Sequence, residues 1–148
     1  MPHFGLMDEN ALGLVQGPLM RAKLHIRGGR RRLRQGKISL GIITLYDALI
    51  SAMQWYTANP EHTMNFQAGE GEDLRDDRKV FEILTRSGVL DGSFDYDAFN
   101  EVVEKSLYED MSSYDYADML KGCESVMTQL GVMPFDETEL PPEDPRTV

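Results

Sequence analysis

The spacing of apolar residues between Leu12 and Leu33 is the feature that most constrains how this chain folds. Small or apolar residues recur there at steps of three and four, as on one side of an α-helix: Leu12, Val15, Leu19, Ala22, Ile26, Gly29 and Leu33. With Asp8 as N-cap and Gly36 as the stop signal, the pattern predicts a helix from about residue 9 to residue 35. Such a helix must bury its apolar side against other elements.

A second helix is predicted from about residue 39 to residue 58, between Ser39 as cap and Asn59-Pro60 as terminator. It is apolar on two faces, which favours a place at the centre of a bundle. Its length approaches the roughly 20 apolar residues that span a bilayer. Asp47 and Gln54 argue for a core helix and against a membrane span, because carboxylates inside a membrane are costly.

Three shorter helices are expected downstream. They cover residues 72–86, residues 95–110 after a cap at Asp95 or Ser93, and a segment from Ser112 or Ser113 to Gly131. Leu74 and Leu107 are expected among their packed residues. Since no window shows the alternation of a strand, we predict an all-α fold, a bundle of about five helices with a long antiparallel first hairpin. Residues 1–132 form one domain, and residues 133–148 an acidic, proline-rich C-terminal tail, docked or frayed.

Charge is divided unevenly along the chain. Residues 1–46 contain eight Lys or Arg and two acids, whereas residues 47–148 contain seven Lys or Arg and twenty-three acids. The net charge of −10 is therefore the balance of a basic first part and a strongly acidic remainder. Such asymmetry bears on partners and on electrostatics within the chain, and not on the fold.

The basic residues of the first part lie on one face of its predicted helix. They recur at steps of three or four, and no acid lies between Glu9 and Asp47. The candidate charged interaction face comprises Lys23, Arg27, Arg30, Arg31, Arg34 and Lys37.

This basic face has two interpretations. It can meet carboxylates, either those of the acidic remainder, within the chain or across a homodimer, or those of an acidic protein partner. It can instead neutralise the phosphates of a nucleic acid, each contact adding about one unit to the salt dependence of binding. Residues 5–45 contain no aromatic side chain to stack on bases, so we favour the first interpretation.

No cluster of residues indicates a catalytic chemistry. Three histidines and one cysteine do not form a transition-metal motif, and the turn at Asp91-Gly92 lacks calcium ligands because Ala98 stands where an EF-hand has its bidentate glutamate. We expect His25 on the flank of the basic helix and Cys123 in the core. We therefore assign no catalytic, cofactor-binding or metal-binding residue.

The first two predicted helices, over residues 24–56, resemble the opening of HEPN domains. The likeness consists of a long helix that ends near Gly36, followed by a helix with Tyr46, Ala48 and Ala52 at close spacing. The resemblance implies a small helical bundle that pairs with a nucleotidyltransferase. It implies a non-catalytic member, because the Arg-x4-6-His motif of the ribonuclease members is missing: Arg75 and Arg78 are not followed by a histidine.

Together these patterns favour a non-enzymatic helical interaction or regulatory module, within which an HEPN-like partner subunit fits. A nucleic-acid-binding regulator is the first alternative, and an enzyme of unknown class the second. The N-terminal residues lack the pattern of a secretory signal and the chain has a single cysteine, so a cytoplasmic location is expected.

Overall fold

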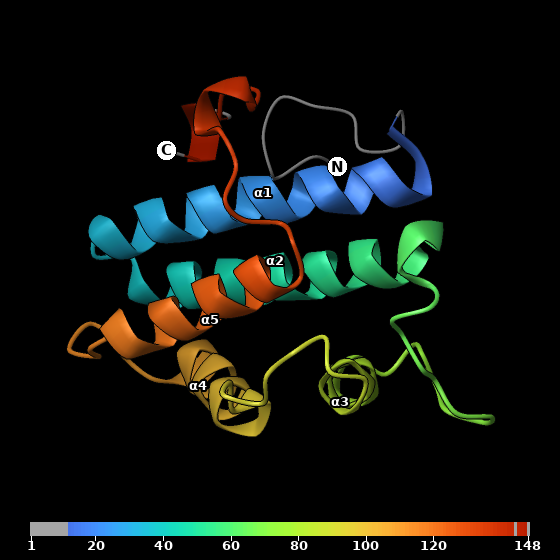
Figure 1. Ribbon diagram of the computed structural model, residues 1–148. Coiled ribbons are helices and arrows are strands. Elements are labelled where there is room, and N and C mark those ends of the chain that lie inside the picture. The colour runs from blue at the N-terminus through green and yellow to red at the C-terminus, as the bar shows by residue number, and fades with distance from the viewer. Residues whose placement is uncertain (1–11, 144, 148) are drawn as a thin grey trace.

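The computed structural model describes residues 12–143 and 145–147, and within these ranges it contains α-helices, 3-10 turns and no strand. The all-α prediction is therefore confirmed. Figure 1 shows α2 as a middle layer between α1 on one side and α3, α4 and α5 on the other. The α-helices are α1 (Gly13–Arg34), α2 (Ile38–Ala58), α3 (Asp77–Arg86), α4 (Tyr96–Tyr108) and α5 (Ala117–Gln129). The 3-10 turns are η2 (Pro60–His62), η3 (Glu137–Glu139) and η4 (Pro145–Thr147).

The predicted long hairpin is formed by α1 and α2, joined by a tight turn at Gly36. Gly36 has a φ of +80°, a backbone conformation that a side chain disfavours. The N–H of Gly36 donates to Leu33 O at 3.1 Å, and the N–H of Lys37 donates to Arg32 O at 2.9 Å. These bonds satisfy the last carbonyls of α1, so the helix ends where the glycine signal predicted.

Two glycines bring the helices of this hairpin close together. Leu45 of α2 fills the space beside Gly29, where a β-carbon would lie 2.8 Å from Leu45 Cδ2. Leu33 of α1 occupies the equivalent space beside Gly41, where a β-carbon would lie 2.7 Å from Leu33 Cδ2. A leucine of each helix thus packs against a glycine of the other, where the backbone carries no side chain.

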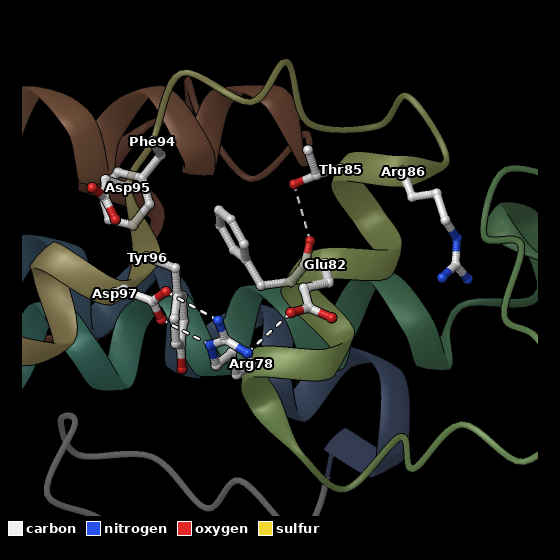
Figure 2. A pocket seen from close by; sticks show the side chains of 9 residues that line it. Arg78, Glu82, Thr85, Arg86, Phe94, Asp95, Tyr96 and Asp97 are labelled. Atoms are coloured by element: carbon white, nitrogen blue, oxygen red, sulfur yellow. Dashed lines mark hydrogen bonds and ion pairs between the residues drawn. The ribbon is translucent and has the colours of Figure 1, made fainter.

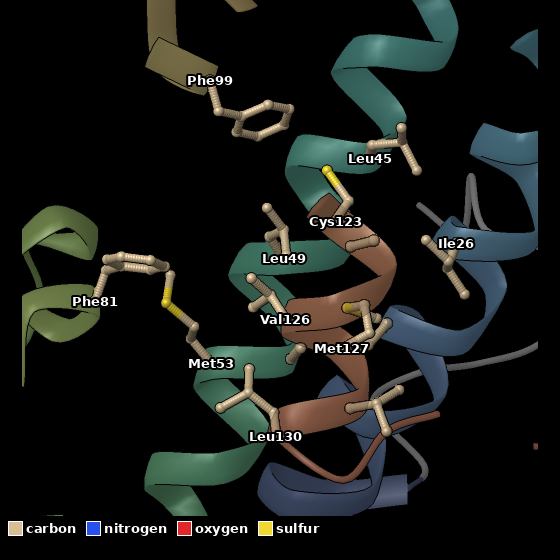
Figure 3. Packing of buried hydrophobic residues seen from close by; sticks show 14 of the residues in the cluster. Ile26, Leu45, Leu49, Met53, Phe81, Phe99, Cys123, Val126, Met127 and Leu130 are labelled. Carbon is tan, nitrogen blue, oxygen red and sulfur yellow. The ribbon is translucent and has the colours of Figure 1, made fainter. Parts of the chain in front are cut away.

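The centre of the core is α2. Ile42, Leu45, Ala48 and Ala52 are fully buried on it, and Figure 3 shows side chains from every other α-helix gathered around its length. Among the described residues, Ile38–Ala58 is the one helix long and apolar enough to cross a membrane, and 56% of its most apolar window is buried inside the bundle. The two apolar faces read from the sequence are explained by neighbours on both sides.

The shorter helices differ from the predictions at their ends. The third helix begins at residue 77 and not at residue 72, because the Asp76 carboxylate accepts hydrogen bonds from Arg78 N–H and Lys79 N–H and caps it there. Leu74 therefore lies outside α3 and is 50% exposed, and Leu107 near the end of α4 is 56% exposed. Both were expected to pack inward, and both expectations are wrong.

The start of the last α-helix was also placed too early. Asp110 accepts a hydrogen bond from Ser112 N–H, which forms a local turn at the expected starting point. Asp115 then accepts a hydrogen bond from Ala117 N–H, and α5 begins there. The Asp95 cap of α4 is as predicted, since its carboxylate accepts a hydrogen bond from Ala98 N–H at 3.0 Å.

The chain leaves α5 at Gly131 and turns back over α1. Val132 is buried, its N–H donates to Met127 O at 2.9 Å, and Phe135 packs against the edge of the core. Figure 1 shows the following segment running across α1. We call residues 133–143 the C-terminal strap; it lies against the part of α1 that carries the basic face.

Candidate interaction surface

The basic face of α1 lies partly beneath the C-terminal strap. Arg27, Arg30 and Arg31 are half-buried there, whereas Arg34 and Lys37 are exposed at the end of the hairpin. Lys23 is half-buried at the other end, with its Nζ 5.7 Å from the centre of the Phe135 ring, within reach of a cation–π contact. The structure thus brings four of the six candidate residues together with the strap and leaves the other two in solvent.

The carboxylate of Glu143 lies between two arginines. Its Oε1 is 3.2 Å from Arg27 Nε, and its Oε2 is in contact with Arg31 Nε. The side chains of the three residues are only 15% to 20% exposed. Partial removal from water strengthens the attraction between such charges and makes the loss of either partner costly, because the other is then left without its counter-charge. Arg27 Nη2 also donates to Pro141 O at 2.9 Å, so the same arginine holds the backbone of the strap.

A second contact joins α1 to both α5 and the strap through Arg30. Its Nη1 donates to Glu124 Oε2 of α5 at 3.1 Å, and its Nη2 donates to Glu137 Oε1 of η3 at 3.1 Å. One guanidinium therefore pairs with two carboxylates, one on a rigid helix and one on the strap. Removing Arg30 would leave both carboxylates without this donor.

Arg32 belongs to the same run of arginines but points toward α2. Its Nη1 donates to Thr44 Oγ1 at 2.7 Å. Burial and then the charge of Arg31 lower the pKa of Arg32, while the nearby Glu143 carboxylate raises it. The arginines therefore repel one another, and Glu143 offsets that repulsion.

The strap residues at this surface were not identified from the sequence. Glu137, Glu143 and Phe135 were included only in a tail described by composition, and Glu124 was one acid among many. Glu124 lies 94 positions from Arg30 in the sequence, and Glu137 lies 107 positions from it. No helical period relates residues that are so far apart. The excess of acidic residues in this part of the chain was the available signal. It indicated that carboxylates would meet the arginines, but not which carboxylate would pair with which arginine.

A polar cleft between α1 and α2 corrects the expectation for His25. His25 is buried, not on an exposed flank, with its Nδ1 3.8 Å from Asp47 Oδ2. Arg21 Nε donates to Ser51 Oγ at 2.8 Å in the same cleft, whose volume is about 170 Å³. The Ser51 hydroxyl therefore accepts a hydrogen bond from a guanidinium, and polar and charged groups of both helices line the cleft.

A larger pocket of about 380 Å³ lies between α3 and the start of α4, with Phe81, Phe94 and Tyr96 among its walls. Figure 2 shows Arg78 at its edge, joined to Asp97 by two hydrogen bonds and to Glu82 by a third. The Arg78 hydrogen bonds lower the pKa of Asp97. Arg78 is thus already paired with carboxylates of the pocket rim, and Arg86, which also lines the pocket, is paired with Glu72. A ligand that used either guanidinium would compete with these bonds.

Cys123 lies in the core, as expected from its place on an apolar stripe. It is fully buried, and burial, followed by the charge of Glu124, raises the pKa of its thiol to about 12. Within the described residues, no three His, Cys, Asp or Glu side chains are grouped as a metal ion requires.

No protein-family model matches the chain, and no curated protein and no solved structure is significantly similar to it.

Proposed function

We propose that this protein is a non-enzymatic helical interaction module that binds an acidic protein segment through the basic face of α1. One observation carries the proposal: Arg27 and Arg31 hold the carboxylate of Glu143 in a partly desolvated site. A surface that can hold one acidic segment has the geometry to hold another of similar chemistry. The face is supported by a rigid helix hairpin, which keeps its arginines at fixed spacing.

An HEPN-like partner subunit, with a cytoplasmic location and the capacity to form a homodimer, falls within this proposal. The residues of the resemblance have roles that suit such a bundle. Gly36 makes the hairpin turn, and Ala48 and Ala52 are fully buried on α2. They support a packed hairpin and carry no catalytic chemistry.

Nucleic-acid binding is the alternative proposal, and it uses the same arginines. A phosphate would replace the carboxylate of Glu143, and charge-assisted bonds from guanidinium groups suit both. The composition of the basic helix counts against it, because residues 5–45 contain no aromatic side chain on which a base could stack. The acidic protein segment therefore remains the first choice.

The experiment compares two labelled ligands on the full-length chain with Glu137→Gln and Glu143→Gln. The ligands are a peptide of residues 133–148 and a single-stranded RNA of similar length, each at low salt and at roughly 0.5 M salt, where charges are strongly screened. Salt-sensitive binding of the peptide, lost when Arg27→Ala and Arg31→Ala are added, is expected. Binding of neither ligand would contradict the interaction module, and preference for RNA would favour the alternative. Arg34→Ala is the matched control, since Arg34 is exposed on the same helix.

A further inference from the structure

We infer that the C-terminal strap is a resident ligand of the basic face, and that the partner displaces it with a segment of the same chemistry: an aromatic side chain followed by spaced carboxylates and prolines. This inference rests on the proposed function, and it names both the kind of partner and the competition that regulates its binding. Two observations carry it: the way in which the strap is held, and the charges beneath it.

The strap is attached to the bundle through side chains. Beyond Met133, its described backbone bonds are internal: Glu139 N–H donates to Asp136 O, and Leu140 N–H donates to Glu137 O. Its described bonds to the helices come from arginine side chains, to Glu137 and to Pro141 O. Beyond Met133, the strap can therefore leave without breaking backbone hydrogen bonds to the helices. Its side-chain contacts can be lost and regained while every helix stays folded.

The basic face needs an anion in place. Arg27, Arg30 and Arg31 follow each other on one side of α1, and burial and then the charge of Arg31 lower the pKa of the adjacent Arg32, which points toward α2. Half-buried cations of like charge are costly when nothing neutralises them. The strap therefore leaves readily only when another acidic segment replaces it, which makes the process an exchange.

The site that holds Glu143 is defined by two guanidinium groups on successive turns of α1. Arg27 Nε and Arg31 Nε each contact one oxygen of the Glu143 carboxylate. Charge-assisted contacts of this kind depend on the carboxylate and not on the chain that carries it. A carboxylate of a partner segment can therefore take the place of Glu143.

The chemistry of the partner can be read from the strap. Its Phe135 lies beside Lys23, its Glu137 pairs with Arg30, and its Glu143 pairs with Arg27 and Arg31. Pro141 and Pro142 precede Glu143, and prolines keep such a segment extended. The partner segment is thus acidic, extended and anchored by an aromatic residue.

Competition from the strap weakens every external ligand. A ligand on a short tether has an effective concentration in the millimolar range, so a resident segment of modest affinity reduces the apparent affinity of a competitor about tenfold or more. The peptide of residues 133–148 should therefore bind the Glu137→Gln, Glu143→Gln chain at least about tenfold more tightly than the wild-type chain. Equal binding to the two chains would overturn the competition and leave the interaction module standing.

Two full-length variants with opposite charge reversals give the decisive test. The first carries Arg27→Glu and Arg31→Glu, so its acidic strap faces glutamates; the second carries Glu137→Lys and Glu143→Lys, so its basic face meets lysines. Neither retains a matched surface within one chain. The strap of the first matches the face of the second, and the mixture should form a 1:1 complex that dissociates at roughly 0.5 M salt.

The outcomes are measured by light scattering after circular dichroism has shown that each variant is helical and unfolds cooperatively. A complex in the mixture, absent from each variant alone, supports recognition of an acidic segment between chains. Two folded variants that do not associate would overturn the inference, because the strap would then be a fixed part of the bundle. As the control, Arg34→Glu with Lys37→Glu replaces the first variant; its strap remains docked and no complex is expected.

Discussion

Leu45 of α2 lies against Gly29 of α1 so closely that a β-carbon on that glycine would be 2.8 Å from Leu45 Cδ2 and 3.4 Å from Leu45 N. The obstacle is the leucine side chain, whose Cγ would also lie only 3.0 Å away, and because Leu45 is fully buried it cannot move aside without disturbing the core. The contact determines how near the two long helices approach, and with it the position of the arginines relative to the rest of the bundle.

Gly29→Ala should therefore destabilise the protein by about 1 to 3 kcal/mol, the usual cost of overpacking a close contact. Its neighbour provides the control: a β-carbon on Gly28 would meet nothing closer than 3.9 Å. Gly28→Ala should be neutral or stabilising by up to about 1 kcal/mol, because alanine favours a helix more than glycine does. Denaturant unfolding of the two variants measures the difference, and equal stabilities would contradict the proposed packing.

Arg30→Ala should loosen the strap and leave the helices intact. The substitution removes hydrogen bonds to Glu124 and Glu137, and the global stability should fall by about 1 kcal/mol because the charges are partly exposed. Amide exchange at Glu139 and Leu140 should accelerate, since their bonds lie within the strap. Arg34→Ala, at an exposed position, is the control and should change neither quantity; unchanged exchange in Arg30→Ala would show that the strap is held by other contacts.

Acid should weaken the loop before α3 through Glu72. The Arg86 hydrogen bond, followed by that from Gly69 N–H, lowers the pKa of Glu72 from 4.5 to about 2. A carboxyl with a lowered pKa in the folded state contributes stability that is complete above its unfolded value and is lost as the pH falls through the folded value. Stabilisation by Glu72 should thus be full above about 4.5 and disappear near pH 2.

The measurement compares unfolding midpoints of the wild type and Glu72→Gln across that range. The variant should be less stable near neutral pH and indistinguishable from the wild type near pH 2. Glu70→Gln, which changes an exposed carboxylate of the same loop, controls for net charge. A deficit of Glu72→Gln that persists at the acid end would assign the effect to lost packing.

Cys123 should resist thiol reagents in the folded protein. Its pKa of about 12, against an ordinary value of 9.0, leaves about a thousandfold less thiolate at neutral pH even before burial limits access. Reaction with a disulfide reagent should be slow in buffer and complete in denaturant. Rapid reaction of the native protein would show that α5 opens readily.

The core of this fold could be predicted from local patterns, whereas the candidate surface could not. The stripe from Ala22 to Leu33 and the two faces of α2 follow the helical period, which depends on near neighbours in the chain. The start of α3 was predicted too early, because the hydrophobic pattern includes Leu74. The side chain of Asp76 caps the helix after that residue. A side-chain hydrogen bond at one position decided that boundary, and a hydrophobic pattern does not contain this information.

The pairing of Glu143 with Arg27 and Arg31 depends on where the chain goes after α5, and no local rule specifies that path. His25 was misplaced for a related reason. It lies beside Ile26 on the helix, and the side of α1 covered by α2 proved wide enough to bury both residues. The sequence indicates which residues favour burial, but the width of a buried side depends on the neighbouring helix.

The central position of α2 has a consequence for synthesis of the chain. Proteins emerge from the ribosome N-terminus first, and a domain completes its core only when its last elements are available. The apolar helix that ends at Ala58 is made well before Cys123, Val126 and Met127 of α5, which cover it in the finished fold. During that interval the nascent hairpin exposes a surface that other chains can bind, so prompt release of the C-terminal third protects the protein from aggregation.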